Sequence, residues 1–377
     1  MICIAVMDAH QTTEVEVTGA HTQFYDKFNI RYEIFQVIKC VWTNDVYQQR
    51  LTQESKYVYP LDRIQDWSCW PDYRVNTEFF IKFVNLLLND ATYVLDEALT
   101  KFPKIHELQH ELRLPQGTLT EEQRAAKAEE LDTAERQAQS YMQLANETMS
   151  MMKLFTKTLS DSFTMPEIVQ RLADMLDYNL DSLTGPKSNN MRVENSAKYY
   201  FHPKTMLADF IEIYLNLGRS DRFVEAVARD GRSYKPANFD TASKILTRLG
   251  LKSPEDMQAW ERLKTRFKIA KEVDDQAEDD LGEVPDEFLD PLMYTLMEDP
   301  VILPMSKVTV DRSTIRTQLL SDPNDPFNRQ PMSIEDVVED TKLKAKIVAF
   351  REERRREKKE KLEKAALEAD KMDTSNE

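Results

Sequence analysis

Glycine is scarce in this chain, at 7 of 377 residues, or about 2% where roughly 7% is usual. Gly-rich phosphate-binding loops, dinucleotide-binding folds and turn-rich β-sandwiches all need more glycine, because they use positive φ angles and close backbone approach. The shortage therefore predicts a mainly α-helical protein. The length allows roughly two domains or one elongated helical domain.

The hydrophobic pattern supports this prediction over most of the chain. Apolar residues recur at helical spacing over 79–98, and Thr120 with Gln123 forms a capping-box signal for a helix over 121–158. Further helices are expected from Met165–Pro166 onward and over 205–217, 223–228, 241–249 and 254–269. We expect an irregular helical-repeat, α-solenoid-like scaffold over 1–271.

Methionines gather in the second half of the helix expected over 121–158. Their positions are Met142, Met149, Met151 and Met152. Such a cluster can form an adaptable binding groove. At helical spacing it more often fills a core, which is the interpretation we favour.

Composition changes abruptly after residue 271. Residues 272–290 hold ten acidic residues and no Lys or Arg, which predicts a solvated acidic linker over 272–285. Residues 286–352 then resemble a compact α+β module, with a strand over 308–310 and Asp311 as the N-cap of the next helix. Ser333 and Thr341 begin two more helices, and 353–377 form a charged tail.

Charge and residue usage exclude several functions. The net charge of −16 argues against a nucleic-acid partner, and no apolar run is long enough to span a membrane. Cys3, Cys40 and Cys69 form neither a disulfide framework nor a zinc site, which favours the cytoplasm and nucleus. His106 and His110 have metal-like spacing but no matching ligands, so we expect no metal and no cofactor.

The C-terminal module carries the specific signal. Residues 286–301, 310–315 and 322–331 closely resemble the U-box of ubiquitin ligases, and among these the ubiquitin conjugation factors that elongate ubiquitin chains. Upstream, residues 24–32, 199–204, 213–217 and 225–234 look like the helical core of that family. Family chains are much longer, so we expect an N-terminally incomplete scaffold: a short isoform, a divergent homologue or a truncated gene model.

The resemblance implies a non-covalent ubiquitin ligase that extends chains on already ubiquitinated substrates for proteasomal degradation. Its U-box is similar to a RING domain in which hydrogen bonds, salt bridges and packing replace zinc, and it binds a ubiquitin-conjugating enzyme through two loops. By position, the contact residues are Leu292, Met293, Tyr294, Pro326, Phe327 and Arg329. Arg329 corresponds to the arginine that holds the enzyme–ubiquitin conjugate in a closed, attack-ready pose.

Alternatives remain at these positions. Leu292 and Tyr294 could pack inside the module, as we expect of Leu296 and Met297, and Arg329 could pair with Asp325. The family's glycine-containing turn is also absent from residues 304–307, which predicts a different local conformation there.

The implied partners are a ubiquitin-conjugating enzyme, ubiquitin, ubiquitinated substrates and an AAA-type segregase ATPase. The alternative function is a non-catalytic scaffold or adaptor that binds such partners through the helical core.

Overall fold

The computed structural model describes residues 24–46, 48–49, 52, 77–115, 119–282, 284–354 and 356. The chain divides into two compact units, Met1–Lys268 and Ile269–Glu377. In the described residues, the first is built of helices, and the second combines short helices with a small sheet. The expected mainly α fold followed by a small α+β module is therefore confirmed. Cys3, Cys69 and most of the charged tail lie outside the described residues.

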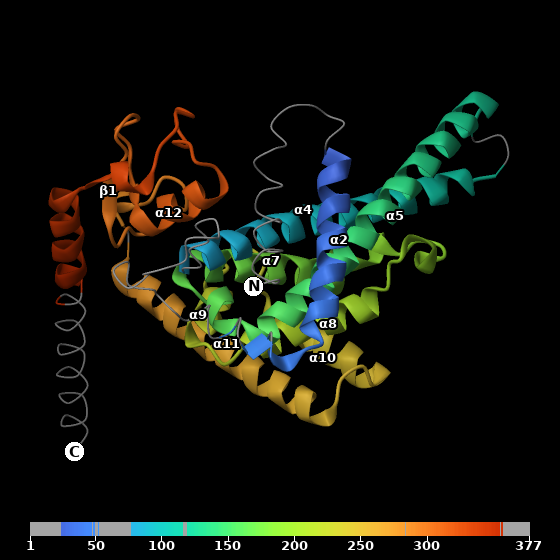
Figure 1. The fold of residues 1–377 in the computed structure, drawn as a ribbon, viewed down its shortest axis with the longest axis horizontal. Helices are drawn as coiled ribbons and strands as arrows, with labels where there is room; N and C mark the ends of the chain where they lie inside the picture. The colour runs from blue at the N-terminus through green and yellow to red at the C-terminus, as the bar shows by residue number, and fades with distance from the viewer. Residues whose placement is uncertain are drawn as a thin grey trace, which may run out of the picture. The chain divides into compact units, whose positions relative to one another are not determined.

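Helices of very different length make up the first unit (Figure 1). Those in the described residues are α2 (Phe24–Trp42), α4 (Thr77–Leu112), α5 (Glu121–Thr158), α6 (Ser160–Phe163), α7 (Pro166–Thr184), η1 (Pro186–Met191), η2 (Ser196–Tyr199), α8 (Pro203–Leu217), α9 (Asp221–Arg229), α10 (Pro236–Leu249) and α11 (Pro254–Leu281), which continues past residue 268. Proline opens α7, α8 and α10 at a position where its missing N–H costs no helical hydrogen bond.

The two longest helices, α4 and α5, pack along each other. The predicted capping box at the start of α5 is confirmed. The Gln123 N–H donates to the Thr120 hydroxyl at 3.2 Å, and the Thr120 N–H donates to the Gln123 side chain at 3.0 Å. Arg124 then reaches back to the Leu112 carbonyl at 2.8 Å, which fastens the start of α5 to the end of α4.

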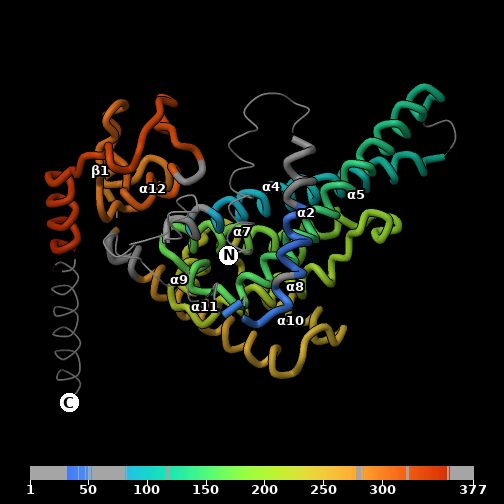
Figure 2. Tube along the Cα trace, viewed as in Figure 1, coloured from blue at the N-terminus to red at the C-terminus, as the bar shows by residue number. Residues whose placement is uncertain are grey.

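The centre of the first unit is apolar and aromatic. In the tube view α7 lies among α4, α8, α9 and α10 (Figure 2). Tyr214 of α8 is fully buried, and its ring lies 5.6 to 6.0 Å from those of Phe239, Trp260 and Phe267. Losing one such buried ring costs roughly 3–5 kcal/mol. Residues 213–217 and 225–234, which carried the family resemblance, thus supply much of this core.

The methionine cluster of α5 belongs to the core as well. Met142, Met149, Met151 and Met152 are all buried, which confirms the core interpretation over the open groove. The helical stripe of α4 is buried from Phe83 to Ala98. The side chains of Phe79 and Phe80 lie outside the described residues.

Two glycines show where this glycine-poor chain needs the residue. Gly250 ends α10 with φ at 60°, the left-handed conformation that commonly closes a helix. Gly218 follows α8, where an added Cβ would lie 2.7 Å from the Leu263 side chain. The first position needs the backbone freedom of glycine, and the second needs its small size.

The acidic run after residue 271 differs from its prediction. Helix α11 continues to Leu281, whereas a linker was expected from residue 272. Glu, Gln, Ala and Leu in this stretch are good helix formers, and Lys271 pairs with Asp275 one turn later at 2.7 Å. Its acidic residues remain solvated on the helix surface where their side chains are described. Like-charge repulsion alone is therefore a poor guide to the end of a helix.

The second unit is organised by a three-stranded antiparallel sheet in the order β2-β1-β3. The strands are β1 (Pro300–Ile302), β2 (Thr309–Asp311) and β3 (Val338–Glu339), and Val301 pairs with both Val310 and Glu339. Around them lie η3 (Asp286–Phe288), α12 (Arg312–Ser321), η4 (Ile334–Asp336) and a helix over 341–354. The predicted strand, N-cap and helix starts are present.

Within the described ranges, no helix combines the length and apolar composition that crossing a membrane requires.

Acidic side chains are buried where α7 meets the end of α9. Asp177 is 1% exposed and accepts a hydrogen bond from the Tyr214 hydroxyl. Burial, followed by the nearby charges of Asp230 and Asp174, holds its pKa well above the usual value. Burial, together with the Asp230 charge, raises the pKa of Asp174 to about 6.

We therefore expect Asp177→Asn to gain stability relative to the parent chain as the pH rises from 4 to 8. A carboxyl group whose folded-state pKa is raised stabilises the fold fully below its unfolded pKa, and this stabilisation is lost as the pH rises through its folded-state pKa. For Asp174, the loss occurs over a pH range from 3.8 to about 6. Asparagine keeps an acceptor for Tyr214 but cannot ionise. Melting temperatures measured across this range test the prediction, with the exposed Glu129→Gln as control. A constant difference between parent and Asp177→Asn would contradict it.

Candidate functional site

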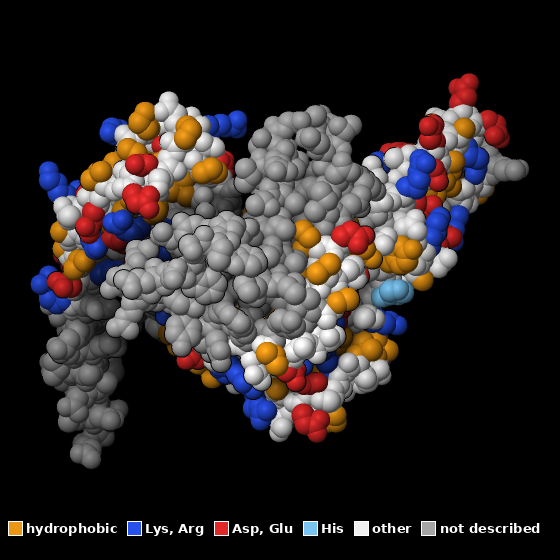
Figure 3. All heavy atoms as spheres, in the orientation of Figure 1, with side chains coloured by type: hydrophobic (Ala, Val, Ile, Leu, Met, Phe, Trp, Pro, Cys, Tyr) orange, Lys and Arg blue, Asp and Glu red, His pale blue; other side chains and the backbone are white. Residues whose placement is uncertain are grey.

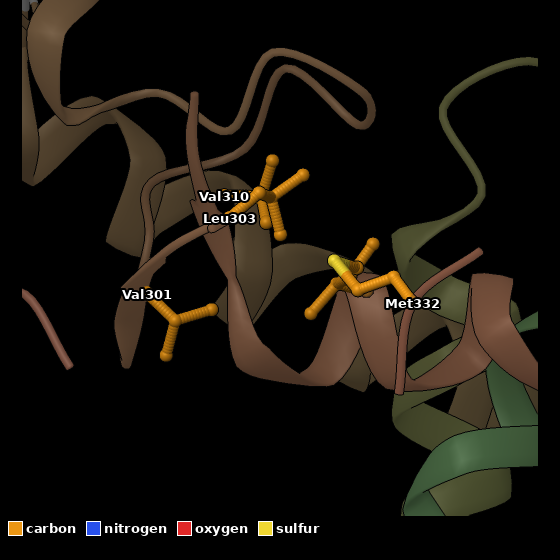
Figure 4. Packing of buried hydrophobic residues seen from close by; sticks show 5 residues of the cluster. Val301, Leu303, Val310 and Met332 are labelled. Carbon is orange, nitrogen blue, oxygen red and sulfur yellow. The ribbon is translucent and has the colours of Figure 1, made fainter. Parts of the chain in front are cut away.

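Two apolar clusters hold the second unit together. The first joins β1, β2 and α12 (Figure 4) and contains Val301, Leu303, Val310, Ile315 and Met332. The second contains Phe288, Met297 and Ile347. These clusters support two loops, which we call the first loop (290–295) and the second loop (325–330). Antiparallel bridges close the bases of the loops, Leu289 with Leu296 and Asn324 with Pro331.

A buried aspartate shapes the first loop. Asp290 is fully buried, and its Oδ1 accepts the N–H groups of Leu292 at 2.7 Å and Met293 at 3.0 Å. Its Oδ2 accepts the N–H of Asp311, on β2, at 2.6 Å. One carboxylate therefore fixes the loop and ties it to the sheet. Charge-assisted hydrogen bonds of this kind are shorter and stronger than neutral ones.

A second buried aspartate plays the same part in the second loop. Asp325 is also fully buried, and its Oδ1 accepts the N–H of Phe327 at 2.9 Å. Its Oδ2 accepts the N–H of Ser306, in the turn between β1 and β2, at 3.3 Å. Ser306 and Asp311 are five residues apart, so the attachment points of the two loops lie no more than about 18 Å apart.

The backbones of the two loops match. We count the aspartate as the first of six loop residues. In each loop, the N–H of the first residue donates to the carbonyl of the sixth at 2.8 Å, and the N–H of the fifth residue donates to the carbonyl of the first at 2.7 Å. The fifth residues are Tyr294 and Arg329, with φ angles of 59° and 60°. Both side chains thus leave the backbone from the left-handed conformation.

Asp311 extends this network into the rest of the unit. Its side chain accepts the N–H of Ser313 at the start of α12 and the N–H groups of Glu298 and Asp299. Lys344 and Arg312 each bond the Asp299 carboxylate, at 2.7 and 2.6 Å, and these hydrogen bonds lower its pKa. Hydrogen bonds and ion pairs thus connect the sheet, α12 and the last helix of this unit. No group of His, Cys, Asp and Glu residues in the described part of the chain could hold a metal ion.

The predicted contact residues lie at the surface. Leu292 is 39% exposed, Met293 51%, Tyr294 76% and Phe327 41%, while Pro326 is half-buried. Hydrophobic side chains are visible at the surface of this unit in Figure 3. The alternative of interior packing is therefore wrong for Leu292 and Tyr294. Their role in binding an enzyme stays a prediction.

Arg329 is exposed, and its guanidinium has no acidic partner among the described residues. The alternative that Arg329 pairs with Asp325 is wrong, because the Asp325 carboxylate accepts backbone N–H groups instead. Interior packing of Met297 is confirmed at 2% exposed, and Leu296 packs partly buried against the same cluster.

Asp290 and Asp325 were not singled out as loop-building residues in the sequence. The signal was present, since both are followed by proline and then by a large apolar residue, in Asp290–Pro291–Leu292 and Asp325–Pro326–Phe327. The turn at 304–307 was expected to change conformation without glycine. Lys307 in this turn adopts φ at 59° without glycine, and whether the turn differs from that of the family stays a prediction.

We expect Asp290→Ala to destabilise the second unit more than Asp325→Ala does. The first variant leaves three backbone N–H groups without their acceptor and the second leaves two, at a cost of roughly 1–3 kcal/mol per buried group. Hydrogen–deuterium exchange of residues 288–331 measures this, with the exposed Asp286→Ala as control. Equal exchange in Asp290→Ala and Asp286→Ala would contradict the role given to Asp290.

Comparisons with known proteins agree with this geometry. The family model described as the ubiquitin elongating factor core matches residues 2–268, and the U-box domain model matches residues 284–356.

Curated relatives match both parts together. The chain is 45% identical to the ubiquitin conjugation factor E4 of Schizosaccharomyces pombe, 40% to the E4 ubiquitin-protein ligase UFD2 of Saccharomyces cerevisiae and 36% to the ubiquitin conjugation factor E4 A of Bos taurus. These alignments cover 91%, 92% and 93% of this chain but 32%, 35% and 32% of the relatives. The chain thus spans about a third of the length of these relatives. It belongs to the ubiquitin elongating factor family and carries the family core followed by a U-box.

Proposed function

We propose that the chain binds a ubiquitin-conjugating enzyme through its first and second loops and promotes ubiquitin transfer to lysine, so that ubiquitin chains are elongated. The observation that carries this proposal is the pair of aspartate-anchored loops, of which the first exposes Leu292 and Tyr294 and the second exposes Phe327 and Arg329. Family membership supports the reaction class, and the exposed side chains support the place of contact.

The loops suit a small interface that forms and dissociates during turnover. Asp290 and Asp325 restrain them, and Pro291 and Pro326 fix one backbone angle in each. Ordering a loop on binding costs free energy, so a loop that is already ordered keeps more of its contact energy as affinity. Exposed apolar side chains on a restrained backbone can therefore anchor a partner of modest contact area.

The proposed reaction forms an isopeptide bond. The lysine ε-amine attacks the thioester carbonyl that joins ubiquitin to the conjugating enzyme, the C–S bond breaks and the thiolate leaves on that enzyme. The amine proton passes to solvent or to a base on the conjugating enzyme. Residues 269–377 contain no Cys, so this unit offers no thiol to carry ubiquitin. The contribution of the chain is therefore proximity and orientation.

Arg329 is the proposed positioning residue. Its backbone is held by Asp325 in the left-handed conformation, and its guanidinium has no acidic partner among the described residues. A guanidinium has five N–H donors in a fixed plane and can reach carbonyl oxygens on two partners at once. Bridging the conjugating enzyme and ubiquitin would hold the conjugate ready for attack.

The proposal extends to ubiquitinated proteins as substrates for proteasomal degradation, to an AAA-type ATPase partner, and to the cytoplasm and nucleus. Family resemblance supports the substrates and the ATPase. The sparse, unpaired use of cysteine supports a reducing compartment.

We predict that Leu292→Ala lowers the affinity for the conjugating enzyme by about tenfold, the effect of losing a central contact residue. Arg329→Ala should keep that affinity within about twofold and lower the rate of ubiquitin discharge to free lysine by about tenfold. Calorimetry measures binding, and single-turnover discharge of a ubiquitin-charged conjugating enzyme measures transfer.

The exposed Lys342→Ala is the matched control for the loss of a surface cation. Equal loss of binding and discharge in Arg329→Ala would assign Arg329 to loop folding. Parental binding by Leu292→Ala would place the interface elsewhere. Binding without any discharge by the parent chain would favour the adaptor function.

A further inference from the structure

The turn of the β1–β2 hairpin repeats the backbone of the two loops. In this third loop (303–308), the Leu303 N–H donates to the Val308 carbonyl at 2.9 Å, and the Lys307 N–H donates to the Leu303 carbonyl at 3.1 Å. Asp290 and Asp325 make the same pair of hydrogen bonds in their loops. The unit therefore presents three loops of one conformation, of which the family resemblance singled out two.

Corresponding positions in the three loops carry related residues. The second residue is proline in each, and the third is a large exposed apolar residue: Leu292, Met305 and Phe327. Met305 is the most exposed of the three, at 56%. The fifth residues are Tyr294, Lys307 and Arg329, and all three have φ of 59–60°.

The third loop differs from the other two at its first residue, and as a result it is hydrogen-bonded to the second loop. Leu303 replaces the aspartate and is fully buried in the apolar cluster, so the third loop has no carboxylate at its own base. The N–H of Ser306 is bonded instead by Oδ2 of Asp325, at 3.3 Å. Asp325 thus holds Phe327 with one oxygen and the third loop with the other. The two loops are hydrogen-bonded neighbours.

A lysine at φ of 59° also needs an explanation. A residue with a Cβ pays about 1 kcal/mol or more in the left-handed conformation, and glycine would avoid that cost. Residues that persist in such a conformation are often kept for their side chains. At the equivalent position, Arg329 is the residue that we propose to touch the conjugate. The ammonium group of Lys307 has no acidic partner among the described residues.

We infer that the third loop is a further contact for the ubiquitin-charged conjugating enzyme. Met305 extends the apolar surface supplied by Phe327, and Lys307 adds a second cation that donates to carbonyl or carboxylate oxygens of the conjugate. The inference rests on the proposed function, since it assigns the same occupant to a loop that is hydrogen-bonded to the second loop. Asp325 then couples both contacts, because it fixes both backbones.

The sharpest test is Lys307→Gly, because its expected effects on folding and on transfer have opposite signs. Glycine relieves the left-handed backbone, so thermal stability should stay at the parental level or rise. Loss of the ammonium group should lower the rate of ubiquitin discharge by about two- to fivefold, the range for one exposed charge contact. Lys307→Arg should restore discharge, since it restores the cation.

Met305→Ala is the companion variant, with Val348→Ala and Lys342→Ala as controls for exposed apolar and cationic side chains. All variants are measured in the full chain by single-turnover discharge, beside Leu292→Ala and Arg329→Ala. Reduced discharge in both Met305→Ala and Lys307→Gly, with parental melting temperatures and unaffected controls, supports the inference.

Parental discharge by Met305→Ala and Lys307→Gly, while Leu292→Ala and Arg329→Ala are impaired, overturns the inference and leaves the proposed function standing. Parental discharge by Leu292→Ala and Arg329→Ala as well removes the proposed function and the inference with it.

Discussion

Two buried carboxylates determine the conformation of the second unit. Asp290 and Asp325 are fully buried and accept five backbone N–H groups between them. A buried charge is tolerable only when its oxygens are hydrogen-bonded, and a buried N–H is tolerable only when it has an acceptor. Here the backbone N–H groups stabilise the buried carboxylates, and the carboxylates are the acceptors that the buried N–H groups need. The result is a small, loop-rich unit whose surface is ordered without a large core.

For function, the consequence is that the buried aspartates hold the loop backbones while the loop side chains remain exposed for contact with a partner. Each aspartate accepts backbone N–H groups of its own loop, so the apolar side chains that follow it can point outward. Leu292 and Phe327 are exposed for this reason, and because Asp325 already accepts backbone N–H groups, the Arg329 guanidinium has no acidic partner in the part of the chain that the structure describes. The proposed transfer reaction needs this kind of preorganised surface, since the contribution that we propose for the chain is orientation without covalent chemistry.

Local signals were readable from the sequence wherever a short-range interaction decides the structure. The capping box of Thr120 and Gln123 and the N-cap of Asp311 lie within a few residues of their partners, and both are confirmed. The predicted end of α11 was wrong, because the helix propensity of residues 272–281 outweighed the repulsion between their acidic side chains. The exposure of Leu292 was left open, because an apolar residue after Asp–Pro reads the same whether it packs inside or outside. The exposure depends on the long-range hydrogen bond from the Asp311 N–H to Asp290, which ties the loop to the sheet and leaves Leu292 39% exposed.

We propose that the chain holds the conjugate of conjugating enzyme and ubiquitin in one orientation. Energy transfer between dyes on ubiquitin and on the conjugating enzyme, joined by a bond that cannot be cleaved, measures that orientation directly. We predict that adding the chain shifts the conjugate toward a single high-transfer state, and that Arg329→Ala binds the conjugate without producing the shift. Binding of the parent chain with no change in energy transfer would contradict the proposed role of the chain in orienting the conjugate.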